Sequence, residues 1–268
     1  QWRDQMTANS KVLVVGAGPA GSAAAFYLAQ AGIDVLLVDK EQWPRDKVCG
    51  DGQMFHSWYI YGEMGIMEEA REAGTMLYGM KSSDVDERLV SFRSDKEYAM
   101  GTRRFVIDDI IRLAAVREGA RFIDNFDVRD LIIRHGKVIG VKAFYKGQMI
   151  EEYADLVILA NGSHSMEARK LGVFNEDPET LWMGARGYYE NVRGLEDLIE
   201  FHYPFPDLNP AGYMWVFPEG DDIANVGVFI TAEALRKSGM KIEDYFTRWR
   251  DETKLGNERL GDARLIGD

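Results

Sequence analysis

Six residues near the start of the chain have the types and spacing of a phosphate-binding turn. Residues 16–21 read GAGPAG and match the pattern G-x-G-x-x-G. Gly16 permits a tight turn, Gly18 lets a diphosphate approach the backbone, and Gly21 allows a strand to pack closely against a helix. A helix that begins at this turn directs its positive N-terminus toward the anion. The pattern therefore indicates dinucleotide binding, with a glycine turn that holds no ligand as the alternative.

An acidic residue follows the turn at the distance that a dinucleotide site requires. Asp39 ends the apolar run 33–39 and lies 18 residues after Gly21. A carboxylate at this position accepts hydrogen bonds from an adenosine ribose and disfavours the 2′-phosphate of NADP. No second G-x-G-x-x-G occurs, and residues 154–162 resemble the late strand with which flavoproteins approach their dinucleotide again. The cofactor that we expect is therefore FAD.

The elements around these residues predict a βαβ unit. Apolar runs at 11–15 and 33–39 predict buried strands, joined by a helix that ends at Gly32. Further segments with strand or helix patterns are at 83–93, 105–119, 126–134, 137–145, 154–162 and 241–253. From about residue 175 the chain becomes rich in alternating aromatic residues, which is typical of antiparallel sheet.

The predicted fold class is α/β. Residues 1–174 are expected to form a Rossmann-type FAD-binding domain with a parallel sheet and a strand insertion near 77–100. Residues 175–268 are expected to form an antiparallel, sheet-rich substrate-binding region.

Three further segments carry a more specific resemblance. Residues 44–52, PRDKVCGDG, look like the loop P-x-x-K-x-C-G-[GD], and residues 104–108, RFVID, look like Arg-x-x-[FIL]-Asp at the start of a helix. Tyr203 is followed after eight residues by 212–218, GYMWVFP. Together with the N-terminal unit, these segments resemble the geranylgeranyl reductase family of the hydroxylase-like flavoproteins.

The resemblance implies a role for each of several residues. The residues implied to bind the cofactor are Gly16, Gly18, Ala20, Gly21, Asp39, Lys40, Cys49, Gly50, Gly52, Arg104, Val128, Asn161 and Gly162. The residues implied to be catalytic are Cys49, Gly50 and Asp51, beside the flavin ring. The residues implied to line the substrate site are Tyr203, Tyr213, Trp215 and Phe217.

Each of these residues also has an ordinary structural interpretation. Cys49 could be a small apolar residue in a turn, and Arg104 could pair with Glu97 or Asp108. Tyr213, Trp215 and Phe217 share one face of a strand, where aromatic residues usually form core. The core and substrate-wall interpretations are compatible, because a prenyl chain binds through buried CH₂ area, at about 0.8 kcal/mol per CH₂. The four histidines, His56, His135, His164 and His202, show no metal-ligand spacing and are expected at the surface or in turns, with no metal.

Two departures from the family pattern stand out. Asn161-Gly162 occupies the place of an Asp-Gly pair, so the contact there carries no charge. The third flavin motif, an apolar strand followed by G-D-A-A-G, is not found. The terminal LIGD could be the beginning of that motif or an earlier strand of the substrate sheet. We therefore expect this chain to be a fragment that lacks the C-terminal region.

The composition of the chain argues against nucleic-acid binding and against insertion into a membrane. The chain has 268 residues with a net charge of −12, which argues against phosphate-backbone recognition of nucleic acid. The single cysteine and the absence of an apolar run of roughly 20 residues predict a cytoplasmic protein with at most peripheral membrane contact.

The predicted function is FAD-dependent reduction of double bonds in an isoprenoid chain on a lipid or quinone, with an external donor such as NAD(P)H or a ferredoxin-like protein. A flavin monooxygenase or halogenase of the same fold, and a non-catalytic flavin- or lipid-binding module, are the alternatives.

Overall fold

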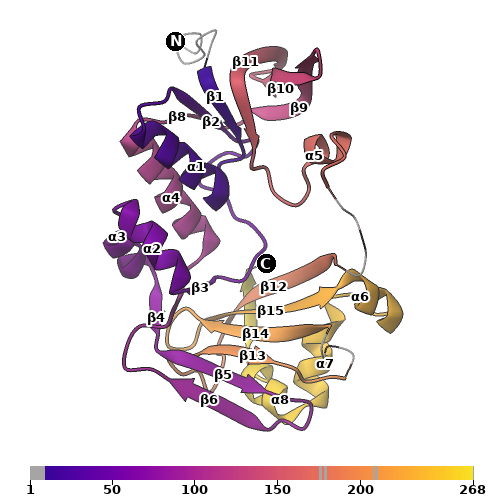
Figure 1. The fold of residues 1–268 in the computed structure, drawn as a ribbon. Helices are drawn as coiled ribbons and strands as arrows, with labels where there is room; N and C mark the ends of the chain where they lie inside the picture. The colour runs from indigo at the N-terminus through magenta and orange to yellow at the C-terminus, as the bar shows by residue number, and fades with distance from the viewer. Residues whose placement is uncertain (1–9, 175–176, 178–179, 207, 209–210, 268) are drawn as a thin grey trace. The chain divides into compact units, whose positions relative to one another are not determined.

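The computed structural model describes residues 10–174, 177, 180–206, 208 and 211–267 and divides them into two compact units (Figure 1). Unit 1 contains residues 10–45, 63–66 and 105–174. Unit 2 contains residues 46–62 and 67–104 and the described residues from 177 onward. Each unit has its own sheet and its own hydrophobic core.

Unit 1 is built on a six-stranded sheet with the order β8-β2-β1-β11-β10-β9. Its elements are β1 (Ser10–Val15), α1 (Pro19–Gln30), β2 (Val35–Val38), α4 (Arg104–Glu118, of which Arg104 belongs to unit 2), β8 (Arg121–Ile123), β9 (Asp127–Arg134), β10 (Lys137–Tyr145), β11 (Gln148–Leu159) and α5 (Met166–Lys170). Strands β8, β2, β1 and β11 pair in parallel, whereas β9, β10 and β11 pair antiparallel.

The parallel part of this sheet follows from its sequence. All four residues of β2, VLLV, are buried, as expected for β-branched and leucine-rich strands covered on both faces. The predicted strand at 154–162 is longer than expected, because β11 begins at Gln148 and serves two partners. Its first half pairs with β10 and its second half with β1. Although its sequence is apolar, this strand is not buried throughout, since the exposed fraction of Leu156 is 52%.

Unit 2 contains a seven-stranded sheet with the order β16-β12-β15-β14-β13-β5-β6 and a three-stranded sheet with the order β3-β7-β4. Its strands are β3 (Gly52–Met54), β4 (Thr75–Leu77), β5 (Gly79–Ser83), β6 (Leu89–Arg93), β7 (Ala99–Gly101), β12 (Trp182–Glu190), β13 (Ile199–His202), β14 (Gly212–Pro218), β15 (Ala224–Thr231) and β16 (Arg264–Gly267). Its helices are α2 (His56–Glu63, of which Glu63 belongs to unit 1), α3 (Met67–Ala73), α6 (Ala232–Ser238), α7 (Asp244–Glu252) and α8 (Lys254–Leu260).

The predicted α/β class, with parallel and antiparallel sheet, is confirmed. The sheet of unit 1 has a parallel and an antiparallel part, and the seven-stranded sheet of unit 2 is antiparallel except for the pair β13 and β5. The division of the chain differs from the predicted boundary at 174, because residues 46–62 and 67–104 belong to unit 2. The expected strand insertion near 77–100 supplies β5 and β6 of the seven-stranded sheet, where β6 is the edge strand and β5 pairs with β13. The terminal LIGD overlaps β16, which pairs antiparallel with β12, so it is a strand of the second sheet.

Strand alternation gives the seven-stranded sheet two different faces. On one face, Met214 and Val216 of β14 join a core with Tyr245 and Trp249 of α7. On the other face, the odd-numbered residues of β14 join an aromatic cluster, described below. The alternation of side chains along the strand therefore places each side chain of β14 in one of two environments.

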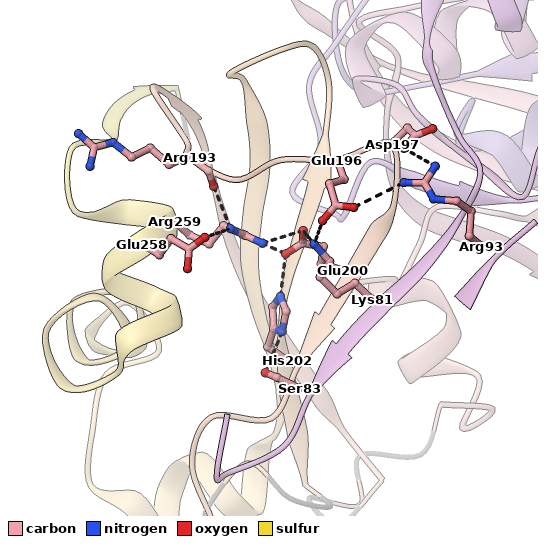
Figure 2. A network of polar contacts seen from close by, with 10 residues as sticks. All are labelled: Lys81, Ser83, Arg93, Arg193, Glu196, Asp197, Glu200, His202, Glu258 and Arg259. Atoms are coloured by element: carbon pink, nitrogen blue, oxygen red, sulfur yellow. Dashed lines mark hydrogen bonds and ion pairs between the residues drawn. The ribbon is translucent and has the colours of Figure 1, made fainter. Parts of the chain in front are cut away.

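A network of charged residues is buried on the helix-covered face (Figure 2). Both oxygens of Glu200 accept hydrogen bonds from Arg259 of α8, from Nε at 3.1 Å and from Nη2 at 3.2 Å. His202 lies between Glu200 and Ser83, with a ring nitrogen 2.9 Å from each. Lys81 contacts Glu196 and lies 3.8 Å from Glu200. We call Lys81, Ser83, Glu200, His202 and Arg259 the arginine network.

The arginine network corrects the prediction for one histidine. His202 was expected at the surface or in a turn, but it is fully buried on β13. Ser83, His202 and Glu200 form a chain of hydrogen bonds like that of a hydrolase, yet at most 4% of each residue is exposed. Each hydrogen bond of this chain ends on another buried side chain, from Ser83 to His202 to Glu200 and on to Arg259, so the network is structural.

In the part of the chain that the structure describes, no helix is long and apolar enough to cross a membrane. Those residues also contain no group of three or more His, Cys, Asp or Glu side chains arranged to hold a metal.

Candidate functional site

The glycine turn of unit 1 connects β1 to α1 and requires glycine at two positions. Gly16 has a φ of +100°, and a Cβ there would lie 2.4 Å from the carbonyl oxygen of Ala160. A Cβ on Gly21 would lie 1.8 Å from the carbonyl oxygen of Gly16. A side chain at either position would collide with backbone, so the turn closes tightly against the sheet.

Gly18 is different, because its surroundings are open. It is the N-cap of α1, and no side-chain hydrogen bond caps this helix. A Cβ on Gly18 would have one described neighbour within 4 Å, the Nη2 of Arg45 at 3.4 Å. An uncapped helix N-terminus beside a guanidinium is an environment that favours an anion.

Asp39 lies directly beside the glycine turn. Its Oδ2 accepts a hydrogen bond from the backbone N–H of Ala17 at 2.7 Å, and its Oδ1 accepts one from Glu41 at 3.0 Å. Each carboxylate oxygen has a second lone pair, so Asp39 can still accept hydrogen bonds from a ribose. The neighbouring Lys40 is exposed and lies 3.7 Å from Glu41.

Arg45 was not among the predicted site residues. Its Nη1 donates to Asp108 Oδ2 at 2.7 Å, and its guanidinium lies 4.5 Å from the centre of the Trp43 ring. Asp108 is fully buried, so the pair fixes the guanidinium next to Gly18. Arg45 and Asp108 lie in two segments that the sequence analysis had noted, 44–52 and 104–108. That the two side chains form an ion pair could be seen only in the folded structure.

The remaining predicted cofactor residues of unit 1 lie in three places. Asn161 follows β11, its Nδ2 donates to Glu167 at 2.7 Å, and its buried Oδ1 has no hydrogen-bond partner among the described residues. Gly162 has a φ of +81°. Ala20 is an exposed residue of α1, and Val128 of β9 packs against the core of the sheet.

These features fit a dinucleotide. The uncapped helix, the open glycine and Arg45 suit a diphosphate, and the free lone pairs of Asp39 suit a ribose. Asn161 Oδ1, which none of the described residues binds, is a buried acceptor of the kind that a ligand satisfies.

In unit 2, the predicted catalytic loop and the predicted substrate strand meet. A Cβ on Gly50 would lie 2.7 Å from the ring of Phe217, and a Cβ on Gly52 would lie 2.6 Å from Ile199. The rings of Trp215 and Phe217 stack at a centroid distance of 5.8 Å. Residues 50–52 therefore lie directly on this pair of rings, with glycine required for the close approach.

An aromatic wall extends along the sheet from these rings. Tyr213 lies 6.3 Å from Trp215 and 6.2 Å from Tyr203, measured between ring centroids. Burial, with smaller effects from Tyr203 and Cys49, raises the pKa of Tyr213. Cys49 is an exposed free thiol that is close enough to Tyr213 to affect it. The aromatic wall, defined as Tyr203, Tyr213, Trp215 and Phe217, thus brings the predicted substrate residues together beside Cys49.

Asp51 is fully buried behind this wall and is held by hydrogen bonds from two directions. Its Oδ1 accepts from the backbone N–H of Arg104 at 3.2 Å, and its Oδ2 accepts from Asn225 Nδ2 at 2.9 Å. Asn225 Oδ1 in turn accepts from the indole N–H of Trp215 at 2.7 Å. Asn225 therefore connects the aromatic wall to the predicted catalytic loop. An asparagine within the apolar strand NVGVFI was the available signal for this role.

Arg104 is the first residue of α4, and its backbone N–H donates to Asp51 Oδ1 at 3.2 Å. The contact of its side chain with the cofactor stays a prediction.

A second carboxyl group adjoins Asp51. Glu219 follows β14, its side chain is 5% exposed, and its Oε2 accepts from Arg103 Nε at 3.0 Å. Burial and the adjacent Asp51 raise the pKa of Glu219 to about 8, although Arg103 acts in the opposite direction. Tyr188 lies beside Asp51. Its burial, and to a smaller extent its interaction with Asp51, raises the pKa of Tyr188 above the usual value. Sequence reasoning gave no role to Glu219 or Tyr188.

Comparison with known proteins defines the class. The sequence profile of the family described as FAD binding domain matches residues 9–244, and the chain belongs to this family. Family membership confirms FAD as the expected cofactor.

The more particular resemblance is to reductases. A menaquinone reductase of Mycobacterium tuberculosis is 31% identical over 252 residues, which cover 91% of this chain and 60% of the relative. A digeranylgeranylglycerophospholipid reductase of Methanothrix thermoacetophila is 32% identical over 222 residues, which cover 81% of this chain and 56% of the relative. The predicted resemblance to prenyl reductases is confirmed, and the chain spans less than two thirds of the length of these relatives.

Solved structures share the fold. A geranylgeranyl bacteriochlorophyll reductase-like protein of Thermoplasma acidophilum has a TM-score of 0.81 at 26% identity, covering 96% of this chain and 64% of that protein. A myxobacterial chondrochloren halogenase has a TM-score of 0.82 at 21% identity, covering 97% of this chain and 61% of the halogenase. At this identity, the likeness to the halogenase concerns the fold alone.

Proposed function

We propose that this protein is an FAD-dependent oxidoreductase that saturates double bonds in an isoprenoid chain carried by a lipid or quinone. The observation that carries this proposal is the placement of residues 50–52 on the rings of Trp215 and Phe217. It joins the two motifs that most specifically resemble prenyl reductases in one place. The names of the similar reductases support the same reaction class.

The residues of unit 1 would bind the dinucleotide part of FAD. The N-terminus of α1 and Arg45 would hold the diphosphate beside Gly18, and Asp39 would accept hydrogen bonds from the ribose. The other proposed contacts in this unit are Gly16, Ala20, Gly21, Lys40, Val128, Asn161 and Gly162.

The residues of unit 2 would act on the reacting part of the substrate. Bound FAD, once reduced, supplies a hydride. Cys49, Gly50 and Gly52 would contact the flavin ring, with Arg104 a further cofactor contact, and the small residues would permit a close approach. The aromatic wall would orient the prenyl chain and exclude water from it, because flat apolar rings suit a chain whose binding comes from buried CH₂ area.

An external donor would supply the electrons, either NAD(P)H or a ferredoxin-like protein. We also propose a cytoplasmic protein that contacts the membrane at most peripherally, because the substrate is a lipid and the chain carries a net charge of −12. Anionic headgroups repel such a chain, so membrane contact would be apolar and local.

The test is product analysis by mass spectrometry. Full-length protein loaded with FAD is given a prenylated quinone or lipid under a strong chemical reductant, and saturated double bonds are counted per chain. We expect saturation, together with a changed count or rate in Cys49→Ser and Trp215→Phe at matched flavin content. A hydroxylated or halogenated product formed with oxygen and halide would instead support the alternative enzyme class. Bound lipid without turnover would support a binding module.

A further inference from the structure

Asp51 of the predicted catalytic loop and Glu219 form a pair of buried carboxyl groups. Asp51 lies between Gly50 and Gly52, the two residues in contact with the aromatic wall. Glu219 follows the last residue of β14, the strand that carries that wall. We call Asp51 and Glu219 the carboxyl pair.

The hydrogen bonds of the carboxyl pair show where a proton belongs. Both oxygens of Asp51 already accept hydrogen bonds, from Arg104 and Asn225. Glu219 Oε2 accepts from Arg103, but its Oε1 is buried with no donor among the described residues. Since the neighbouring Asp51 group can only accept when ionised, a proton on Glu219 Oε1 satisfies both groups at once. Two adjacent buried carboxylates are also unfavourable when both are charged.

The surrounding charges support the same state. Arg103 donates to Glu219, and Tyr188 lies beside both Asp51 and Glu219. Arg186 and its partner Asp46 lie next to Tyr188. The guanidinium groups of Arg103 and Arg186 lie 4.7 and 4.4 Å from the centre of the Tyr188 ring. Arg186 pairs with Asp46 at 2.7 Å. The two guanidinium groups next to Tyr188 are thus matched in number by Asp46 and Asp51, and a neutral Glu219 keeps this balance.

We infer that Asp51 and Glu219 hold one proton between them at neutral pH and supply it to the site during double-bond reduction. This inference rests on the proposed function. Saturation of one alkene consumes two electrons, carried by the hydride from reduced FAD, and one proton. The π bond is lost, one C–H bond forms with the hydride and the other with the proton. The carboxyl pair is then left with one more negative charge, and it recovers its proton from water.

The first experiment measures the proton itself by infrared absorption of protonated carboxyl groups from pH 5 to 10, on the full chain without substrate. Glu219→Gln is an isosteric change that keeps the contact with Asp51. We expect the wild-type protein to show a protonated carboxyl that disappears near pH 8 and that is missing in Glu219→Gln. The matched control is Glu152→Gln in unit 1, because burial raises the pKa of Glu152 to about 7. This control must keep the band that titrates near pH 8. Identical spectra for wild type and Glu219→Gln would overturn the inference.

The second experiment measures single-turnover saturation of a prenylated quinone at matched flavin content. Glu219→Gln is expected to react about 100-fold more slowly, the lower end of the range for loss of an acid–base group, with partial recovery in Glu219→Asp. Glu152→Gln should react at the wild-type rate. If wild type saturates the substrate and Glu219→Gln does so equally fast, the proton inference fails and the proposed function stands. If wild type saturates nothing, both fail.

Discussion

Unit 2 contains two buried polar clusters of opposite character, the arginine network and the carboxyl pair (Figure 2 shows the first). In the arginine network, Arg259 donates from all three guanidinium nitrogens, and Glu200 accepts on both oxygens. Around the carboxyl pair, several buried atoms have no hydrogen-bond partner among the described residues: Glu219 Oε1, Tyr188 Oη, and Nε and Nη1 of Arg186. One cluster has its hydrogen bonds complete, whereas the other leaves several unmade.

The two clusters also shift the pKa of a glutamate in opposite directions. Burial alone would raise the pKa of Glu200, but the His202 hydrogen bond and the charge of Arg259 outweigh it and lower that pKa. Burial and Asp51 raise the pKa of Glu219 to about 8. Buried polar groups are normally satisfied, and strongly shifted groups concentrate at functional sites. The difference therefore assigns stability to the arginine network and chemistry to the carboxyl pair.

The largest expected effect comes from breaking the arginine network. Arg259→Met keeps much of the side-chain volume but leaves Glu200 buried without its main counter-charge. We expect a loss of about 3–5 kcal/mol in the free energy of unfolding, measured by urea denaturation. FAD content under native conditions should be unchanged. A loss below about 1 kcal/mol would show that the network is not what stabilises unit 2.

The next effect concerns Asn225, which binds Asp51 of the carboxyl pair and also accepts a hydrogen bond from Trp215. Asn225→Leu removes the acceptor of Trp215 Nε1 and a donor to Asp51. Two buried groups lose a partner, so we expect a loss of about 2–3 kcal/mol in the free energy of unfolding. The double variant Trp215→Phe with Asn225→Leu should lose less free energy of unfolding than the two single variants lose together. The reason is that both single changes remove the same hydrogen bond between Trp215 and Asn225.

A smaller effect is expected in the way that the free energy of unfolding depends on pH through Glu219. The folded state holds the proton of Glu219 up to about pH 8, whereas the unfolded state releases it near the ordinary glutamate value. Because the folded state then binds more protons, this group makes stability fall as pH rises between these values, by at most about 1.4 kcal/mol per pH unit. Glu219→Gln should therefore gain about 1–2 kcal/mol relative to wild type between pH 6 and 8, measured by urea denaturation at each pH. A constant difference across this range would contradict the protonated state.

The smallest effect is expected at an exposed ion pair. Arg88 binds Asp84 on the surface of unit 2. Solvent screens such pairs, so Arg88→Gln should leave the urea midpoint unchanged. A clear shift would mean that burial is not what distinguishes the arginine network from ordinary surface charges.

The sequence predicted the elements with strong local patterns. The strands predicted at 11–15 and 33–39 correspond to β1 and β2, and the helix predicted at 105–119 corresponds to α4. The predicted glycine turn follows β1. Their patterns arise from local packing and from backbone conformations that few residues adopt. The aromatic alternation of 212–218 likewise predicted which residues of β14 share a face.

The sequence did not predict contacts that depend on long-range pairing. His202 was expected in a turn because a single histidine has no local pattern, and its burial results from β13 pairing with β5 and β14. Arg45 and Asp108 are 63 residues apart, and Asp51 and Asn225 are 174 apart. Glu219 resembled an ordinary turn residue after a proline, since only the fold brings Asp51 beside it.

The central claim is that Asp51 and Glu219 share one proton at neutral pH, and NMR titration of the Glu219 carboxyl carbon tests it most directly. The measurement uses ¹³C-labelled glutamate in wild type and in Asp51→Asn, with Glu219→Gln to assign the signal. We predict an apparent pKa of about 8 for wild type and a lower pKa in Asp51→Asn, because removal of the neighbouring charge favours the ionised form. A wild-type pKa near the ordinary glutamate value, unchanged in Asp51→Asn, would contradict the account.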